Sequence, residues 1–114
     1  IMKLISKFFR RKKSIGQDDL VRPYCIRAKQ AILHQDLTKA IAYLNCGIKV
    51  APDRLSLYLQ RAQILQYGMD NCSRALEDYR YILKELESKP DQDLASKCKQ
   101  AMRDMMDPGH VEMR

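Results

Sequence analysis

Apolar residues recur every three or four positions along most of the chain, which is the spacing that places them on one face of an α-helix. Between Leu20 and His34, for example, the apolar and small positions are Leu20, Tyr24, Ala28, Ala31 and Ile32. This pattern predicts a helix that begins near Leu20. Pro23 would then lie in the first turn, where a helix tolerates proline.

The first residues carry a different pattern. In residues 2–13 (MKLISKFFRRKK), the apolar residues Leu4, Ile5, Phe8 and Phe9 share a helical face and basic residues occupy the others. Residues 14–17 are expected to end this segment, because Gly16 is a helix stop and Asp18 or Asp19 can cap the next helix. Residues 1–17 are therefore predicted to form a basic amphipathic segment. A helical domain of residues 18–106 and a tail of residues 107–114 would follow it.

Four more helices are expected after His34. They cover residues 37–51, 55–68, 73–87 and 93–106, and polar or proline-containing turns separate them. Pro52 and Pro90 lie at the ends of the second and fourth of the five main helices. The predicted fold class is all-α, with about five main helices and a short N-terminal amphipathic helix.

One stretch of sequence returns in altered form. YCIRAKQA at residues 24–31 reappears as YLQRAQIL at residues 58–65, 34 residues later. A helix, a tight turn, a second helix ending in Pro-Asp and a restart at this period resemble the tetratricopeptide repeat. Two units carry the resemblance, and residues 93–106 are similar to the solvating helix that closes such arrays. The matching positions are Tyr24, Ala28, Ala31, Ala40, Gly47 and Pro52 in residues 21–54, and Tyr58, Ala62, Ala75, Tyr79 and Pro90 in residues 55–90.

The second unit departs from the repeat pattern. It has one additional residue in the turn around residues 68–71, Ile82 at a position where a small residue is usual, and a longer second helix. Two units also bury little core, since about three repeats are normally needed for stability. The C-terminal helix, the N-terminal segment or a second copy of the chain would cover the ends, and a homo-oligomer is one expectation.

The positive charge is concentrated at the start of the chain. The net charge is +7, and six of the 21 basic residues precede the first acid, Asp18. The other 15 nearly balance the 14 acidic residues. A nearly neutral helical body does not favour a nucleic-acid partner.

Three functions fit the basic segment: contact with an anionic membrane surface, contact with nucleic-acid phosphate, or targeting, including a mitochondrial transit role. The membrane reading has the best physical basis, because apolar residues can enter the headgroup boundary while cations meet anionic lipid. The alternative is that the same apolar face packs on Leu20 or Ala31 and caps the array. The expected membrane contacts are Leu4, Ile5, Lys7, Phe8, Phe9, Arg10, Arg11, Lys12 and Lys13.

No pattern of catalytic or metal-binding residues is recognisable. The two histidines, His34 and His110, are isolated, and there is no CxxC pair or Gly-rich phosphate loop. Acids such as Glu77 and Asp78 are interpreted as ordinary solvated charge. We expect neither an enzyme nor a cofactor nor a metal site. Cys25, Cys46, Cys72 and Cys98 fall on apolar or small-residue faces, which indicates a reducing, cytoplasmic setting.

The family resemblance implies a binding groove lined by the first helix of each unit. It would receive a protein or peptide partner, with Arg22 and Lys29 available to a carboxylate and Leu59 and Tyr67 offering apolar area. The alternative is that Lys29, Gln63 and Gln66 form only a solvated face. The Lys, Asn and Arg clamp of some family members is absent, since Gln60 and Gln63 stand where asparagine is expected. The predicted groove residues are Arg22, Cys25, Lys29, Leu33, Leu59, Gln63, Gln66 and Tyr67.

These observations predict a non-enzymatic adaptor for protein–protein interaction. The alternative function is that of a peripheral membrane protein anchored by residues 2–13. No run of about 18–20 apolar residues, the length needed to cross a bilayer, is present in the sequence.

Overall fold

The computed structural model describes the backbone of residues 2–106 and the side chains of residues 16–106. All regular structure in this range is helical, so the predicted all-α class is confirmed. The elements are α1 (Met2–Leu33), α2 (Leu37–Val50), α3 (Leu55–Gln63), the π-helical turn η1 (Ile64–Gly68), α4 (Cys72–Glu85) and α5 (Gln92–Met106). α2, α4 and α5 begin and end within two residues of the predicted bounds, whereas the single helix predicted over residues 55–68 is divided into α3 and η1.

The chain divides into two units between Arg54 and Leu55. Unit 1 contains α1 and α2, and unit 2 contains α3, η1, α4 and α5. The division falls where the second repeat unit was expected to begin. Each unit buries its own set of apolar residues.

α1 is a single helix of 32 residues, so the predicted break at residues 14–17 and the separate N-terminal helix are wrong. Gly16 lies inside α1 without a positive φ. A glycine in a helix costs only about 1 kcal/mol relative to alanine, which neighbouring helix formers can outweigh. Pro23 also lies in the interior of α1, where it removes one i→i−4 hydrogen bond. Because α1 is continuous, its first residues do not fold back onto Leu20 or Ala31.

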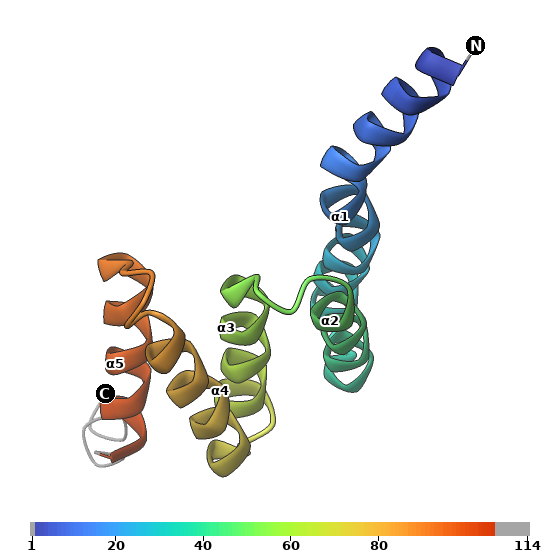
Figure 1. The fold of residues 1–114 in the computed structure, drawn as a ribbon. Helices are drawn as coiled ribbons and strands as arrows, with labels where there is room; N and C mark the ends of the chain where they lie inside the picture. Colours follow the sequence, from blue (N-terminus) through green and yellow to red (C-terminus); the bar gives the residue numbers. More distant parts are fainter. Residues whose placement is uncertain (1, 107–114) are drawn as a thin grey trace. The chain divides into compact units, whose positions relative to one another are not determined.

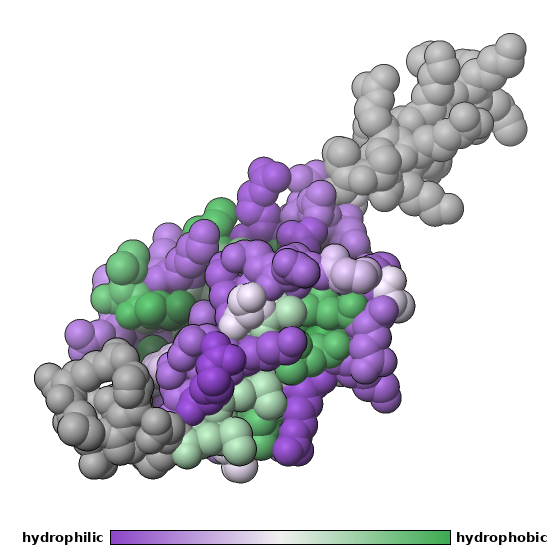
Figure 2. Space-filling view, turned by 90° about the vertical axis from the view of Figure 1, so that its left-hand side faces the viewer, coloured by the Kyte–Doolittle hydropathy of each residue, from purple (hydrophilic) through white to green (hydrophobic). Residues whose placement is uncertain are grey.

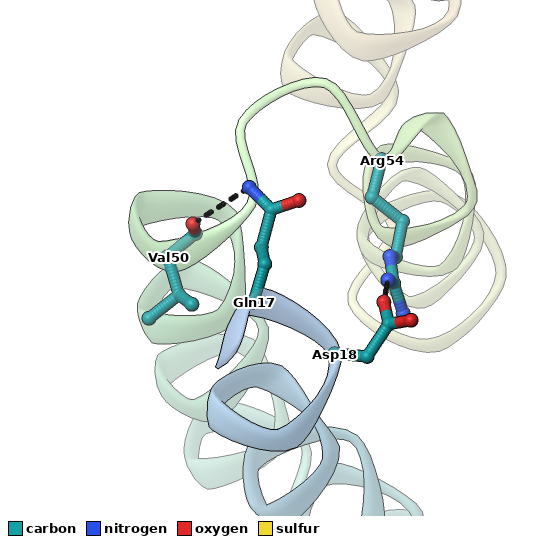
Figure 3. Close-up of polar contacts among 4 residues, drawn as sticks. All are labelled: Gln17, Asp18, Val50 and Arg54. Carbon is teal, nitrogen blue, oxygen red and sulfur yellow. Dashed lines mark hydrogen bonds and ion pairs between the residues drawn. The ribbon is translucent and has the colours of Figure 1, made fainter. Parts of the chain in front are cut away.

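Unit 1 is a hairpin in which α2 lies antiparallel beside the second half of α1, and α1 continues beyond the end of α2 (Figure 1). Small and aliphatic residues fill the contact, and this lets the two helices approach closely. They are Val21, Ala28 and Ala31 on α1 and Ala40, Leu44 and Gly47 on α2. At the open end, Gln17 Nε2 donates to the Val50 carbonyl over 3.3 Å, and Arg54 pairs with Asp18 (Figure 3).

Three residues, His34, Gln35 and Asp36, form the turn between α1 and α2. Gln35 adopts a left-handed conformation with φ of 60°. This lets the Gln35 N–H donate to the Ile32 carbonyl and the Asp36 N–H donate to the Ala31 carbonyl, each over 2.9 Å. The Asp36 side chain then accepts a hydrogen bond from the Lys39 N–H and caps α2. The polar dipeptide therefore ends one helix and begins the next.

In unit 2, α4 packs against both α3 and α5 (Figure 1). Asn71 caps α4 by accepting from the Arg74 N–H. The core combines small residues with a few large ones, and Tyr79 and Ile82 of α4 are fully buried. The other buried core positions are Leu57, Leu59, Ala62, Ile64, Leu65, Ala75, Leu86, Cys98 and Ala101.

The additional residue predicted around residues 68–71 is associated with a π-helical turn just before them. In η1 the Met69 N–H donates to the Ile64 carbonyl over 3.0 Å, an i→i+5 bond that takes one more residue per turn than the α-helix. The chain then reverses at Asp70, which has φ of 53°. This turn holds Gln66 in the core of unit 2.

Candidate partner-binding surface

The face of the molecule seen in Figure 2 is mainly hydrophilic, with hydrophobic residues gathered in separate patches. The eight predicted groove residues belong to two different units. Four lie on α1 in unit 1, and four lie on α3 and η1 in unit 2. Each unit therefore presents its own candidate surface.

On α1, the structure places Arg22, Lys29 and Leu33 at exposed positions, while Cys25 is half-buried. Leu33, the last residue of α1, is 81% exposed. Ile26 is 49% exposed and was not among the predicted residues. It has the same i, i+4, i+7 spacing as the others, and this could have identified it.

We call Arg22, Ile26, Lys29 and Leu33 the outer face of α1. Their spacing puts two cations and two apolar side chains in one stripe, on the side of the helix away from the buried Val21 and Ala28. Neither Arg22 nor Lys29 takes part in the ion pairs found among the described side chains. Both charges are therefore available to a partner.

A shallow hollow of about 390 Å³ adjoins this stripe. It is lined by Asp19, Arg22, Pro23, Ile26, Arg27 and Gln30. The hollow thus offers apolar carbon and two guanidinium groups, beside one carboxylate. That combination suits a partner side chain that is partly apolar and partly acidic.

In unit 2, two predicted groove residues prove to be buried. Leu59 belongs to the core, and Gln66 is only 8% exposed. The Gln66 amide donates to the Ala101 carbonyl over 2.9 Å and accepts from the Tyr79 hydroxyl over 2.8 Å. Neither residue is available to a partner, and Gln66 instead joins η1 to α4 and α5. The burial of Gln66 could not be predicted from the sequence, because no sequence signal indicated the π-helical turn.

The other two predicted residues of unit 2 are exposed. Gln63 lies at the surface at the end of α3, and Tyr67 is 61% exposed. The Tyr67 hydroxyl donates to Asp104 Oδ2 over 2.9 Å, which joins η1 to α5. Partial burial of the ring and this hydrogen bond raise the pKa of Tyr67 to about 12. The exposed ring face remains accessible while the hydroxyl is engaged.

Asp78 is not the solvated acid that the sequence suggested. It is 7% exposed and receives two hydrogen bonds from Arg61, Nε to Oδ2 at 2.9 Å and Nη2 to Oδ1 at 2.7 Å. The hydrogen bond to Asp78 raises the pKa of Arg61. Arg61 also lies 5.5 Å from the centre of the Tyr58 ring, which stacks on Tyr81. This cluster stabilises the α3–α4 contact.

No metal-binding site is found in the part of the chain that the structure describes. Residues 16–106 contain no group of three or more His, Cys, Asp or Glu side chains placed to hold an ion. Cys98 is fully buried, and desolvation raises the pKa of its thiol to about 11. Cys46, in contrast, is exposed, so the prediction that every cysteine lies on an apolar face is wrong for this residue.

The predicted membrane-contact residues, Leu4 to Lys13, lie outside the described side chains. Their backbone belongs to α1. Among the described residues, no helix combines the length and the apolar character that crossing a membrane requires.

Comparison of the chain with protein-family models, with curated proteins and with solved structures finds no match.

Proposed function

We propose that this protein is a non-enzymatic helical adaptor and that the outer face of α1 binds an acidic, amphipathic segment of a partner protein. The observation that carries the proposal is the joint exposure of Ile26 and Leu33 on one helix face with two cations that pair with none of the described acids. Single exposed apolar residues are common on surfaces. Two such residues in one stripe with unpaired cations, beside a hollow, are typical of a recognition site.

The chemistry of the stripe indicates the partner. Covering Ile26 and Leu33 would contribute about 1.5–3 kcal/mol for each side chain that is fully removed from water. Carboxylates facing Arg22 and Lys29 would fix the register and speed association. A helical segment with apolar and acidic residues at i, i+3 or i+4 spacing satisfies both requirements.

A tetratricopeptide-like arrangement of each helix pair belongs to the same proposal. The small residues that carry the resemblance, Ala28 and Ala40 in unit 1 and Ala62 and Ala75 in unit 2, are all fully buried. α5 packs on α4, as a closing helix of such an array would. These features support close helix pairing within each unit, which the repeat requires.

Selection from a random peptide library displayed on phage tests the proposal directly. Peptides of about 16 residues suffice, since they can form about four helical turns. Peptides enriched on the full chain are expected to combine acidic and apolar residues at helical spacing. Their affinity, measured by fluorescence anisotropy, should fall at least about tenfold in the double variant Arg22→Glu, Lys29→Glu.

The matched control is Arg80→Glu, Lys84→Glu on α4. Both residues are exposed, and the change in net charge is the same. Equal loss of binding in the two double variants would show that only net charge matters and would contradict the proposed surface. Enriched peptides without acidic residues would contradict the proposed partner chemistry. Circular dichroism establishes that each variant is folded.

The membrane-surface function is a second proposal, and the length of α1 favours it. α1 has 32 residues and α2 has 14, so a large part of α1 extends past its partner helix. A long cationic helix whose sequence is amphipathic can lie on an anionic bilayer.

Sedimentation with phosphatidylcholine vesicles, with and without phosphatidylserine, tests this second proposal. Vesicles that contain phosphatidylserine should bind the full chain, and this binding should be lost in the double variant Phe8→Gln, Phe9→Gln. This variant keeps the net charge, so unchanged binding would show charge attraction without insertion.

Self-association is a third proposal for the same molecule. A short array leaves surfaces that a second copy would cover. Light scattering of the full chain over a wide concentration range measures the effect, and a monomer throughout would contradict it.

A further inference from the structure

A second hollow, of about 270 Å³, lies where α1 turns into α2. Its polar lining comes from three parts of unit 1: Arg27 and Gln30 from α1, His34 and Asp36 from the turn, and Lys39 and Tyr43 from α2. We call it the turn hollow. It shares Arg27 and Gln30 with the 390 Å³ hollow beside the outer face of α1, so the two hollows adjoin.

The turn hollow is rich in hydrogen-bond donors. Arg27 and Lys39 are exposed and belong to none of the ion pairs found among the described side chains. His34 supplies a ring N–H in either protonation state, and Tyr43 supplies a hydroxyl. The single acid in the lining, Asp36, already accepts the Lys39 backbone N–H as the cap of α2. Donors and positive charge therefore exceed acceptors and negative charge.

We propose that the turn hollow binds a phosphate monoester carried by the partner segment that the outer face of α1 recognises. The inference rests on the proposed function, because the shared Arg27 and Gln30 place the phosphate next to that segment. A phosphorylated side chain a few residues beyond the apolar and acidic anchors would reach the turn hollow while the anchors occupy the outer face.

The donor set suits a phosphate better than a carboxylate. A phosphate monoester carries about −1.5 to −2 charge at neutral pH and presents three acceptor oxygens. Arg27 can bind two oxygens through its guanidinium fork, and Lys39 adds a point charge from the neighbouring helix. Tyr43 and His34 can donate to the remaining oxygen. A carboxylate has only two oxygens and one charge, so it leaves part of this donor set without a partner.

The first test uses inorganic phosphate as the probe. The ¹⁵N-labelled full chain is titrated with phosphate at constant ionic strength, with chloride as the balancing salt, and amide chemical shifts are followed by NMR. Saturable shifts are expected around Arg27, His34 and Lys39. Lys39→Gln should weaken the binding at least about tenfold, because a charged hydrogen-bond donor is lost.

Lys49→Gln is the matched control, since Lys49 is exposed on the same helix but does not line the hollow. This variant should bind phosphate as the unmodified chain does. Shifts that do not saturate, shifts spread over all basic residues, or equal weakening in both variants would overturn the site.

The second test uses a peptide enriched on the full chain, synthesised with and without a phosphoserine at each position beyond its anchors. At one position the phosphate should improve affinity at least about tenfold, and Lys39→Gln should remove only this improvement.

Phosphate binding without any enriched peptide would contradict the proposed function and leave the anion site standing. If phosphorylation leaves the affinity of the enriched peptides unchanged at every position, the inference is overturned and the proposed function stays intact. Tight, Lys39-dependent binding to vesicles containing phosphatidic acid, together with indifference to phosphopeptides, would assign the site to lipid phosphate and overturn the inference.

Discussion

Unit 1 and unit 2 are both helical, but they use their polar side chains in opposite ways. In unit 2, polar groups join the helices from within: Asp78 is paired with Arg61, and Gln66 joins α4 to α5. In unit 1, small apolar residues fill the helix contact, and the two side-chain contacts at its open end lie at exposed positions. Its cations and several large apolar residues face outward along α1.

This difference in the placement of polar side chains indicates that the two units have different roles. A satisfied buried network favours one arrangement of helices, because any other would leave buried polar groups without partners. A two-helix hairpin with exposed Ile26 and Leu33 gains stability from a partner that covers them. In the proposed adaptor, we infer that unit 2 has the more uniquely specified core and that unit 1 carries the binding surface.

Asp78→Ala is expected to change the free energy of unfolding most, and it tests the contrast between the two units. The variant removes the carboxylate that accepts two hydrogen bonds from Arg61, whose side chain is only 18% exposed. Breaking a largely buried pair from one side should reduce the free energy of unfolding by about 2–4 kcal/mol. Urea unfolding followed by circular dichroism measures the loss. Asp93→Ala removes the exposed Lys97–Asp93 pair and should cost less than about 0.5 kcal/mol. Similar losses in the two variants would contradict a polar core in unit 2.

Gln66→Ala addresses the contact between η1 and the rest of unit 2. It removes the acceptor of the Tyr79 hydroxyl and the side-chain donor to the Ala101 carbonyl, which should cost about 1–3 kcal/mol. Hydrogen exchange should show that the amides of α5 lose protection before those of α3. Gln63→Ala, at an exposed position three residues earlier, should change stability by less than about 0.5 kcal/mol. Unchanged protection of α5 in Gln66→Ala would contradict the role of this side chain.

The sequence predicted the existence and type of these helices because their apolar residues are strictly periodic. It could not predict the partners of Asp78 and Gln66. Arg61 and Asp78 are 17 residues apart, and their pairing depends on how α3 and α4 pack. Gln66 lies in η1, and the sequence pattern showed one additional residue near residues 68–71 without showing that a π-helical turn would form before them.

The predicted helix break at residues 14–17 is wrong for a related reason. Glycine and proline are strong local signals, but each costs a helix only a limited free energy, and both Gly16 and Pro23 are accommodated inside α1. The resemblance to the repeat implied Arg22, Lys29 and Leu33 as groove residues but not Ile26, which shares their helical spacing.

Two substitutions of Gly16 test the continuity of α1 in unit 1, and the first is expected to have a smaller effect than the variants above. A Cβ on Gly16 would meet no atom within 4 Å, so Gly16→Ala should stabilise the protein by about 0.5–1 kcal/mol. Gly16→Pro should have the opposite sign, because proline in a helix interior costs about 3 kcal/mol. Urea unfolding and helical ellipticity measure both variants. If residues 14–17 were instead a linker, Gly16→Pro would leave the ellipticity unchanged.

The smallest effect concerns the surface contact of unit 2 at high pH. Burial and the hydrogen bond to Asp104 raise the pKa of Tyr67 from 10.0 to about 12, so the folded state favours the neutral phenol. The corresponding stability is fully present below about pH 10, the unfolded value, and is lost as the pH rises through about 12. Because Tyr67 is 61% exposed, solvent screens the interaction and the loss should be small.

Tyr67→Phe isolates this contribution. The variant should be slightly less stable than the unmodified chain at about pH 9, and the difference in urea midpoint should shrink towards about pH 12 as the unmodified chain loses its hydrogen bond. Tyr24→Phe in unit 1 is the control, because the Tyr24 hydroxyl has no hydrogen-bond partner among the described residues. A difference between Tyr67→Phe and the unmodified chain that stays constant with pH would show that the hydroxyl of Tyr67 does not join η1 to α5. The contrast between the two units would then rest on the buried contacts of Asp78 and Gln66 alone.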